Sequence, residues 1–152
     1  MESRKPIAED LFTWPAESPS LIAGRCSDCD TVAFPFRDSC PRCGRTAIGK
    51  ELLEREGILW SWTSQGFRPK APFSGNLLGG GTDTWYVGLV EIGGKIRVES
   101  LLSNVTEQDL EIGMPLRLTV IPFREEESGD TVVTFAFEPA GDAAETTEVT
   151  NA

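Results

Sequence analysis

The residues of this sequence whose types and spacing could best do chemistry are four cysteines, Cys26, Cys29, Cys40 and Cys43. They form two Cys-x-x-Cys pairs separated by ten residues. Each pair predicts a tight turn with both thiolates pointing at one centre, and the ten residues are enough for a short hairpin that brings the turns together. Zinc is bound tetrahedrally by four such sulfurs at about 2.3 Å. The spacing therefore predicts a zinc ribbon, with iron as the alternative ion.

Two other interpretations of the cysteines fit the chain less well. Disulfides need an oxidising compartment and are typical of short, cysteine-rich secreted chains, whereas this chain has four cysteines in 152 residues. A redox motif would be a single Cys-x-x-Cys at a helix start, not two facing copies. Residues 1–10 lack the apolar run of a signal peptide, and no stretch reaches the roughly 18 to 20 apolar residues of a membrane span. We therefore expect a reduced, cytoplasmic protein.

A metal held by four cysteines has no free position for water or substrate, which a catalytic zinc retains. The predicted ion is therefore structural, and its binding can contribute on the order of 10 kcal/mol to the folding of a small module. Histidine is absent from the sequence, which removes the Ser-His-Asp and Cys-His arrangements. The remaining carboxylates, lysines and hydroxyls form no recognisable catalytic group. We expect no catalytic residue and a chain that is not an enzyme on its own.

The elements that would position the cysteines follow from composition. Residues 1–20 are a lead in which 6–12 predict a short amphipathic helix, with Ile7, Leu11 and Trp14 on its apolar side. The ribbon occupies residues 21–50, and a β pattern follows over residues 51–140. Residues 141–152 are small, polar and acidic, which predicts a disordered tail.

The β region contains five strand patterns bounded by turn residues. Gly93-Gly94 predicts a two-residue hairpin turn between the second and third patterns, which would put Trp85, Val87 and Leu89 on the side of Val98. Thr106, with Asp109 three residues later, predicts a helix start before the fourth pattern. Five strands with a small helix between the third and fourth predict an OB-fold barrel, with an SH3-like barrel as the alternative. The strand patterns cover residues 58–65, 85–92, 95–102, 116–123 and 131–138.

The order of these segments carries a resemblance to a known family. The ribbon reads Gly24-Arg25-Cys26-x-x-Cys29, then Phe34-Pro35-x-Arg37, then Cys40-Pro41-x-Cys43-Gly44, and a barrel pattern follows it. The chain thereby resembles the acyl-CoA-associated OB-fold proteins with an N-terminal rubredoxin-like zinc ribbon, a family long filed as a domain of unknown function. The resemblance covers about residues 6–139, and its specificity lies in the combination of motifs.

The resemblance implies an accessory subunit that pairs with a thiolase or thiolase-like enzyme, sometimes with a hydratase, in acyl-CoA metabolism. The settings it suggests are acyl transfer and carbon-carbon cleavage in the degradation of steroid side chains, lipids or aromatic acids. The partner would hold the catalytic residues. Arg68 and Lys70 are candidates for contact with the phosphates of CoA, and a solvated loop is the alternative.

Nucleic-acid binding is the alternative function, because OB-folds and zinc ribbons both bind single strands by a positive groove and stacking aromatic residues. The chain carries 14 Lys and Arg against 24 Asp and Glu, a net charge of −10. Residues 24–50 have five cations and three acids, an excess of two, which leaves −12 on the remainder. A polyanion is repelled at long range by such a charge, so the sequence argues against this alternative.

Overall fold

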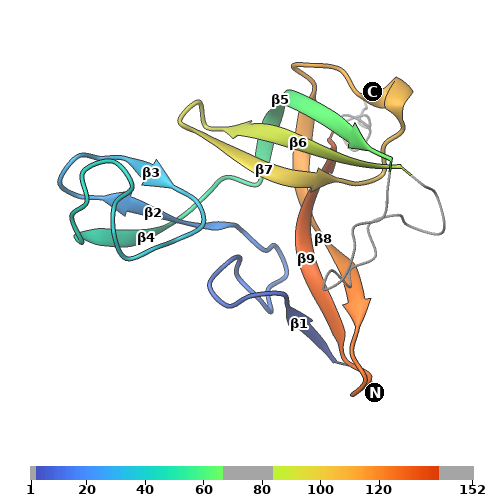
Figure 1. The fold of residues 1–152 in the computed structure, drawn as a ribbon, viewed down its shortest axis with the longest axis horizontal. Coiled ribbons are helices and arrows are strands. Elements are labelled where there is room, and N and C mark those ends of the chain that lie inside the picture. Colours follow the sequence, from blue (N-terminus) through green and yellow to red (C-terminus); the bar gives the residue numbers. More distant parts are fainter. Residues whose placement is uncertain (1–2, 67–83, 141–152) are drawn as a thin grey trace, which may run out of the picture.

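The computed structural model describes residues 3–66 and 84–140 and is almost entirely β (Figure 1). The barrel strands are β5 (Glu56–Gln65), β6 (Trp85–Ile92), β7 (Ile96–Leu102), β8 (Pro115–Glu125) and β9 (Thr131–Pro139). They pair in the order β9-β7-β6-β5-β8, and β8 also pairs with β9, which closes the barrel. The predicted OB-like barrel and its five strands are therefore confirmed. No helix in the described part of the chain has the length and apolar composition to span a membrane.

A second, three-stranded sheet carries the ribbon and lies to one side of the barrel in Figure 1. Its strands β2 (Ile22–Cys26), β3 (Val32–Ala33) and β4 (Ile48–Leu52) are antiparallel, with β2 in the centre. The close approach of these strands depends on Gly24, where a Cβ atom would lie 2.7 Å from Cγ2 of Ile48. The predicted N-terminal zinc-ribbon layout is present.

The predicted helix over residues 6–12 is wrong. Residues Arg4–Pro6 form strand β1, which pairs in parallel with residues 131–133 of β9. Backbone groups that would pair within a helix are hydrogen-bonded to the sheet instead: the Ile7 amide donates to the carbonyl of Val133 at 2.8 Å. Asp10 has a φ of 62°, which is incompatible with a right-handed helix. The apolar spacing reflects instead a lead that lies across the barrel, with Phe12 buried and bridged to Leu21.

The small helix between the third and fourth barrel strands is confirmed as the 3₁₀ turn η1 (Glu107–Asp109). Its start has the predicted cap, since both the amide and the hydroxyl of Thr106 donate to Oδ2 of Asp109, at 2.9 and 3.1 Å. The Asp109 carboxylate thus satisfies the Thr106 amide at the start of the turn.

The hairpin between β6 and β7 has a three-residue turn, Gly93, Gly94 and Lys95, instead of the predicted two. Both glycines have positive φ angles, 64° and 67°. The extra residue sets Ile92 opposite Ile96 and Val90 opposite Val98. Because side chains alternate along a strand, this one-residue difference exchanges the two faces of β6. The predicted placement of Trp85, Val87 and Leu89 on the side of Val98 is therefore wrong, and Val90 and Ile92 share that side and fill the core.

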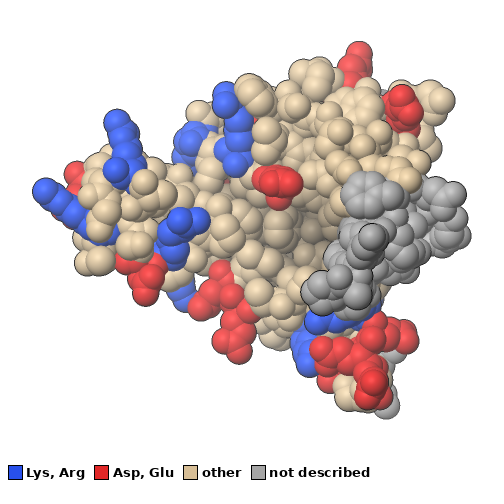
Figure 2. Space-filling view, in the orientation of Figure 1, with Lys and Arg blue, Asp and Glu red and all other residues tan. Residues whose placement is uncertain are grey.

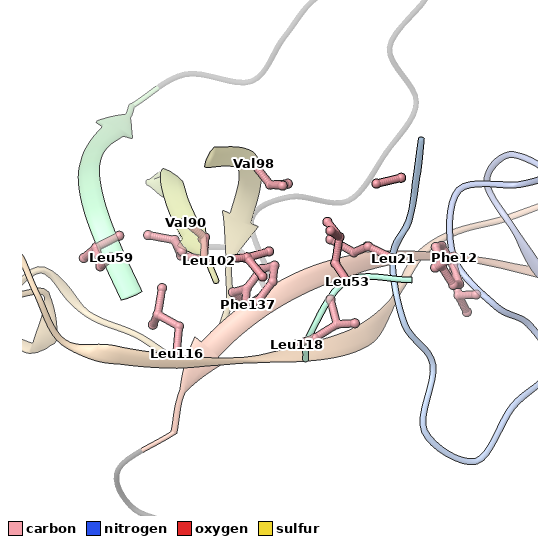
Figure 3. Packing of buried hydrophobic residues seen from close by; sticks show 13 residues of the cluster. Phe12, Leu21, Leu53, Leu59, Val90, Val98, Leu102, Leu116, Leu118 and Phe137 are labelled. Atoms are coloured by element: carbon pink, nitrogen blue, oxygen red, sulfur yellow. The ribbon is translucent and has the colours of Figure 1, made fainter. Parts of the chain in front are cut away.

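One continuous hydrophobic core joins the barrel to the lead and the first ribbon strand. Figure 3 shows it running from Leu59 and Leu116 at one end to Leu53, Leu21 and Phe12 at the other. Phe137, fully buried, lies opposite Leu102 of β7 and Leu118 of β8. The division of the chain at residues 20, 50 and 140 stays a prediction, and the predicted tail lies outside the described residues.

Candidate metal centre

The two Cys-x-x-Cys turns of the ribbon have the same backbone geometry. In the first, the Cys26 amide donates to the Thr31 carbonyl at 2.9 Å, and the Asp30 amide donates back to the Cys26 carbonyl at 2.8 Å. In the second, the corresponding bonds join Cys40 to Arg45 at 2.8 Å and Gly44 to Cys40 at 3.0 Å. Each turn thus closes one residue after its second cysteine. The sequence repeat is a structural repeat.

The residue that closes each turn is in the left-handed conformation, with a φ of 68° at Asp30 and 79° at Gly44. Glycine adopts this conformation without steric cost, and aspartate is among the side chains that tolerate it best. Asp30 also accepts a hydrogen bond from Nη1 of Arg25 at 2.8 Å. This ion pair helps hold the first turn, whereas Gly44, which closes the second turn, has no side chain to form one.

The four sulfurs converge on one point. All lie within 4.8 Å of one another, and the Cys26–Cys43 and Cys29–Cys40 sulfur pairs are each 3.6 Å apart. Sulfurs at tetrahedral positions about 2.3 Å from a zinc ion are separated by roughly 3.8 Å. The cysteines are not disulfide-bonded. They are arranged for metal binding, and their four thiolates fit a tetrahedral, thiophilic ion.

The thiols differ in their readiness to ionise. The amides of Cys43 and Arg42 point at the Cys40 sulfur, at 3.4 and 3.3 Å, and lower the pKa of Cys40 to about 6. Hydrogen bonding with Thr31 lowers the pKa of Cys29. The Arg45 amide lowers the pKa of Cys43, but desolvation and three neighbouring sulfurs outweigh this effect and raise the pKa to about 11. The second turn therefore contains one thiol that ionises readily, Cys40, and one that resists ionisation, Cys43.

The metal centre is tied to the barrel by an ion-pair chain that the sequence did not predict. Glu51 of β4 accepts from Nε of Arg25 at 2.6 Å and from Nζ of Lys95, in the β6–β7 turn, at 2.7 Å. These two cations lower the pKa of Glu51 to about 2, Arg25 having the larger effect. Arg25 immediately precedes the candidate ligand Cys26, so these ion pairs link the first cysteine turn to the barrel. The three residues are far apart in sequence, and no local pattern marks them.

An aromatic contact supports the same junction. Phe34, in the hairpin between the two cysteine turns, packs edge-on against Phe135 of β9 with ring centroids 5.6 Å apart. Val32 and Phe34 also pack on the shared core. Arg68 and Lys70, the candidate CoA contacts, lie outside the described residues.

Comparisons with known proteins agree with this geometry. Residues 13–49 match the family model of the rubredoxin-like zinc ribbon domain of ChsH2. This region of the chain is therefore similar to the rubredoxin-like zinc ribbon domain of ChsH2. The match spans both cysteine turns and begins within the lead, at residue 13. The resemblance read from the sequence is thereby confirmed.

Two relatives extend the comparison beyond the ribbon. A "DUF35 domain-containing scaffold protein" of Methanocaldococcus jannaschii is 25% identical over 123 residues, which cover 77% of this chain and 78% of the relative. A solved structure titled "Ltp2-ChsH2(DUF35) aldolase" matches with a TM-score of 0.56 and 26% identity, over 80% of this chain and 85% of that chain. The similarity therefore includes the barrel as well as the ribbon.

Proposed function

We propose that this protein is a zinc-binding, non-catalytic accessory subunit of a thiolase or thiolase-like enzyme that acts on acyl-CoA substrates. The observation that carries the proposal is the closed set of four sulfurs, which leaves a bound zinc no position for substrate. The chain also lacks histidine, so its chemistry would have to come from a partner. Acyl transfer or aldol cleavage in steroid side-chain, lipid or aromatic-acid degradation is the setting we propose.

The relatives support a role through assembly. The archaeal relative is named a scaffold protein, and the matching solved structure is named as an aldolase that combines Ltp2 with ChsH2. In the present chain Cys26, Cys29, Cys40 and Cys43 would hold the zinc and fix both turns of the ribbon. The Glu51 ion pairs and the Phe34–Phe135 contact would then hold the ribbon at a set position on the barrel. A scaffold needs such fixed relative positions to present one surface to a partner.

Co-expression provides the test. The chain would be produced with each thiolase-type enzyme of its source organism, purified through a tag on the chain, and weighed by native mass spectrometry. We expect a complex of fixed stoichiometry with one of them, and acyl-CoA turnover that depends on both proteins. A thiolase that is active without any accessory subunit is the negative control. A chain that turns over acyl-CoA by itself, or that forms no complex with any of these enzymes, would contradict the proposal.

Single-stranded nucleic acid is the alternative partner, and one observation favours it. Lys and Arg side chains gather over the ribbon, around β2 to β4, in Figure 2. Among the residues that the structure describes, Arg37 and Arg42 form no ion pair. Filter binding of a single-stranded oligonucleotide at about 50 and 200 mM salt would decide, because phosphate contacts make affinity fall steeply with salt. We expect negligible binding at both concentrations, since the whole chain carries a charge of −10.

A further inference from the structure

Three of the large hydrophobic side chains that stand exposed in the described structure lie close together, on β5 and the turn before β8. Ile58 is 49% exposed, Trp60 45% and Ile112 60%. Ile58 and Trp60 belong to β5, and the turn that carries Ile112 is fixed to the same strand, since the Gly113 amide donates to the carbonyl of Leu59 at 2.8 Å. Exposed apolar side chains that cluster in this way are typical of interaction sites, whereas scattered ones are not.

A β-bulge places Trp60 and Trp62 on different faces of β5. Leu59 pairs with Val90 and Ser61 pairs with Leu89, so Trp60 is the extra residue between them. Trp62 packs on the core, with its ring 6.1 Å from that of Tyr86, whereas Trp60 stands on the outer face. Without the bulge, two residues spaced two apart would share a face. Strand alternation alone would therefore place both tryptophans on one face, and the bulge separates them.

Trp60 is held in place before any partner arrives. The guanidinium of Arg97 lies 3.9 Å from the centroid of the Trp60 ring, and Nε of Arg97 is 3.4 Å from Oε2 of Glu91. Glu91 is also the cross-strand neighbour of Ile58 and of Arg97. Fixing these side chains in advance lowers the entropy cost of docking on them. Tryptophan and arginine are also the residues that most often dominate binding energy at protein interfaces.

The charge beside these residues indicates what would bind. A groove of about 570 Å³ adjoins Ile58, with Pro115 and Leu116 in its wall and the carboxylates of Glu54, Glu56 and Glu91 around it. Glu91 is paired with Arg97, but Glu54 and Glu56 form no ion pair with any residue that the structure describes. The chain's own C-terminal segment, residues 141–152, has three acids and no cation, so its charge is the wrong sign. The groove favours a cationic occupant with apolar side chains.

We propose that this surface, formed by Ile58, Trp60, Arg97, Glu54 and Glu56, is where the partner enzyme docks, through a segment that pairs an apolar side chain with Lys or Arg. The proposal rests on the proposed function, since the occupant is the thiolase-type enzyme. Ile58 and Trp60 would supply the apolar contact, and Glu54 and Glu56 would attract the cations and fix the register of the segment. The metal turns, on the other side of the Glu51 ion pairs, would take no direct part.

The test uses the complex isolated by co-expression. Trp60→Ala should raise its dissociation constant at least tenfold, as expected for an interface anchor. The double variant Glu54→Lys and Glu56→Lys should raise it about tenfold, mainly by slowing association at low salt. Leu52→Ala is the matched control, because Leu52 is 57% exposed but lies on ribbon strand β4; its effect should be below twofold. Unchanged thermal midpoints of the free variants would exclude unfolding as the cause.

Hydrogen exchange on the wild-type complex is the second measurement. Strand β5 and the β6–β7 turn should gain protection when the partner binds. If Trp60→Ala and the double variant both bind like the wild type, the docking surface lies elsewhere, although the proposed function would stand. A homodimer of the chain alone that Trp60→Ala dissolves would identify a second copy as the occupant and overturn the proposal. Failure of the wild type to bind any thiolase-type enzyme would overturn both proposals.

Discussion

The barrel buries many large aliphatic and aromatic side chains, Leu59, Val90 and Phe137 among them, whereas residues 22–52 of the ribbon bury one large aliphatic side chain, Ile22, beside Ala23, Cys26 and Cys40. Burying a large apolar side chain contributes roughly 1.5–3 kcal/mol, and the ribbon has few of them. Its two turns would depend on a shared ion instead. The comparison teaches that a small lobe with little apolar burial can draw its folding energy from a metal instead of a core.

The largest expected effect comes from removing one sulfur ligand. Cys40→Ser should abolish tight zinc binding, with a loss on the order of 10 kcal/mol from the binding free energy, because that energy folds the turns. Metal analysis and hydrogen exchange would show a zinc-free chain with unprotected ribbon amides and protected β8 and β9. Ser39→Ala, beside the ligand, is the control and should retain one zinc. Full metal content and native spectra in Cys40→Ser would show that the cysteines do not hold the ribbon.

The matching change in the barrel is Phe137→Ala. Phe137 is fully buried where β9 meets β7 and β8, and such truncations cost about 3–5 kcal/mol. We expect this loss in urea unfolding followed by tryptophan fluorescence, while the zinc content stays at one per chain. Phe137→Leu should lose clearly less. If zinc is released in proportion to the loss of stability, the two regions fold as one unit and the contrast between them fails.

The link between the two regions should have a smaller effect. Glu51→Gln should cost about 1 kcal/mol, because the side chains of Arg25, Lys95 and Glu51 remain 36%, 42% and 23% exposed and water screens their attraction. The pKa of Glu51 is lowered to about 2, so this contribution is complete above the unfolded value near 4.3 and is lost as the pH falls through 2. Unfolding measured at pH 6 to 7, where the ribbon retains its metal, is the suitable assay.

A double-mutant cycle provides the control for that experiment. Lys95→Met removes the barrel side of the pair, and the double variant should lose less than the sum of the single losses. Perfect additivity would mean that Glu51 and Lys95 do not couple, and the ribbon would then be held on the barrel by apolar packing alone.

The smallest expected effect is the release of a proton when zinc binds. The pKa of Cys43 is raised to about 11 and that of Cys40 is lowered to about 6, so at pH 7.5 the metal-free chain keeps the Cys43 proton and has lost most of the Cys40 proton. Zinc must displace the former, and affinity should therefore rise with pH up to about 11. Calorimetry in two buffers with different ionisation enthalpies would count the protons released. A count of zero would mean that Cys43 is not a ligand.

The sequence predicted what local patterns determine. Residues 58–65 and 131–138 alternate and end at turn residues, and both are strands within a residue or two of the predicted bounds. The four cysteines lie in two short motifs whose spacing sets their geometry, so the candidate ligand set could be read directly. The helix cap at Thr106 is likewise a contact over three residues.

The sequence did not predict what depends on partners far along the chain. The apolar residues of the lead have helical spacing, but its backbone pairs with β9, more than 120 residues later. The extra residue in the Gly93 turn and the bulge at Trp60 each reverse the face of a strand, and neither leaves a mark in the hydrophobic pattern. Glu51 meets Lys95 across 44 positions. Such contacts arise from the closed barrel and become visible only with it.

Strand β1 has a practical consequence for anyone who handles this protein. Its three residues cover one edge of β9, from Thr131 to Val133, which would otherwise present free amides and carbonyls. Open strand edges of this kind pair with other molecules and promote aggregation. A chain shortened to begin at residue 8 would lose this cover, although every cysteine and the whole of β9 would remain. Purification tags are therefore better placed at the C-terminus.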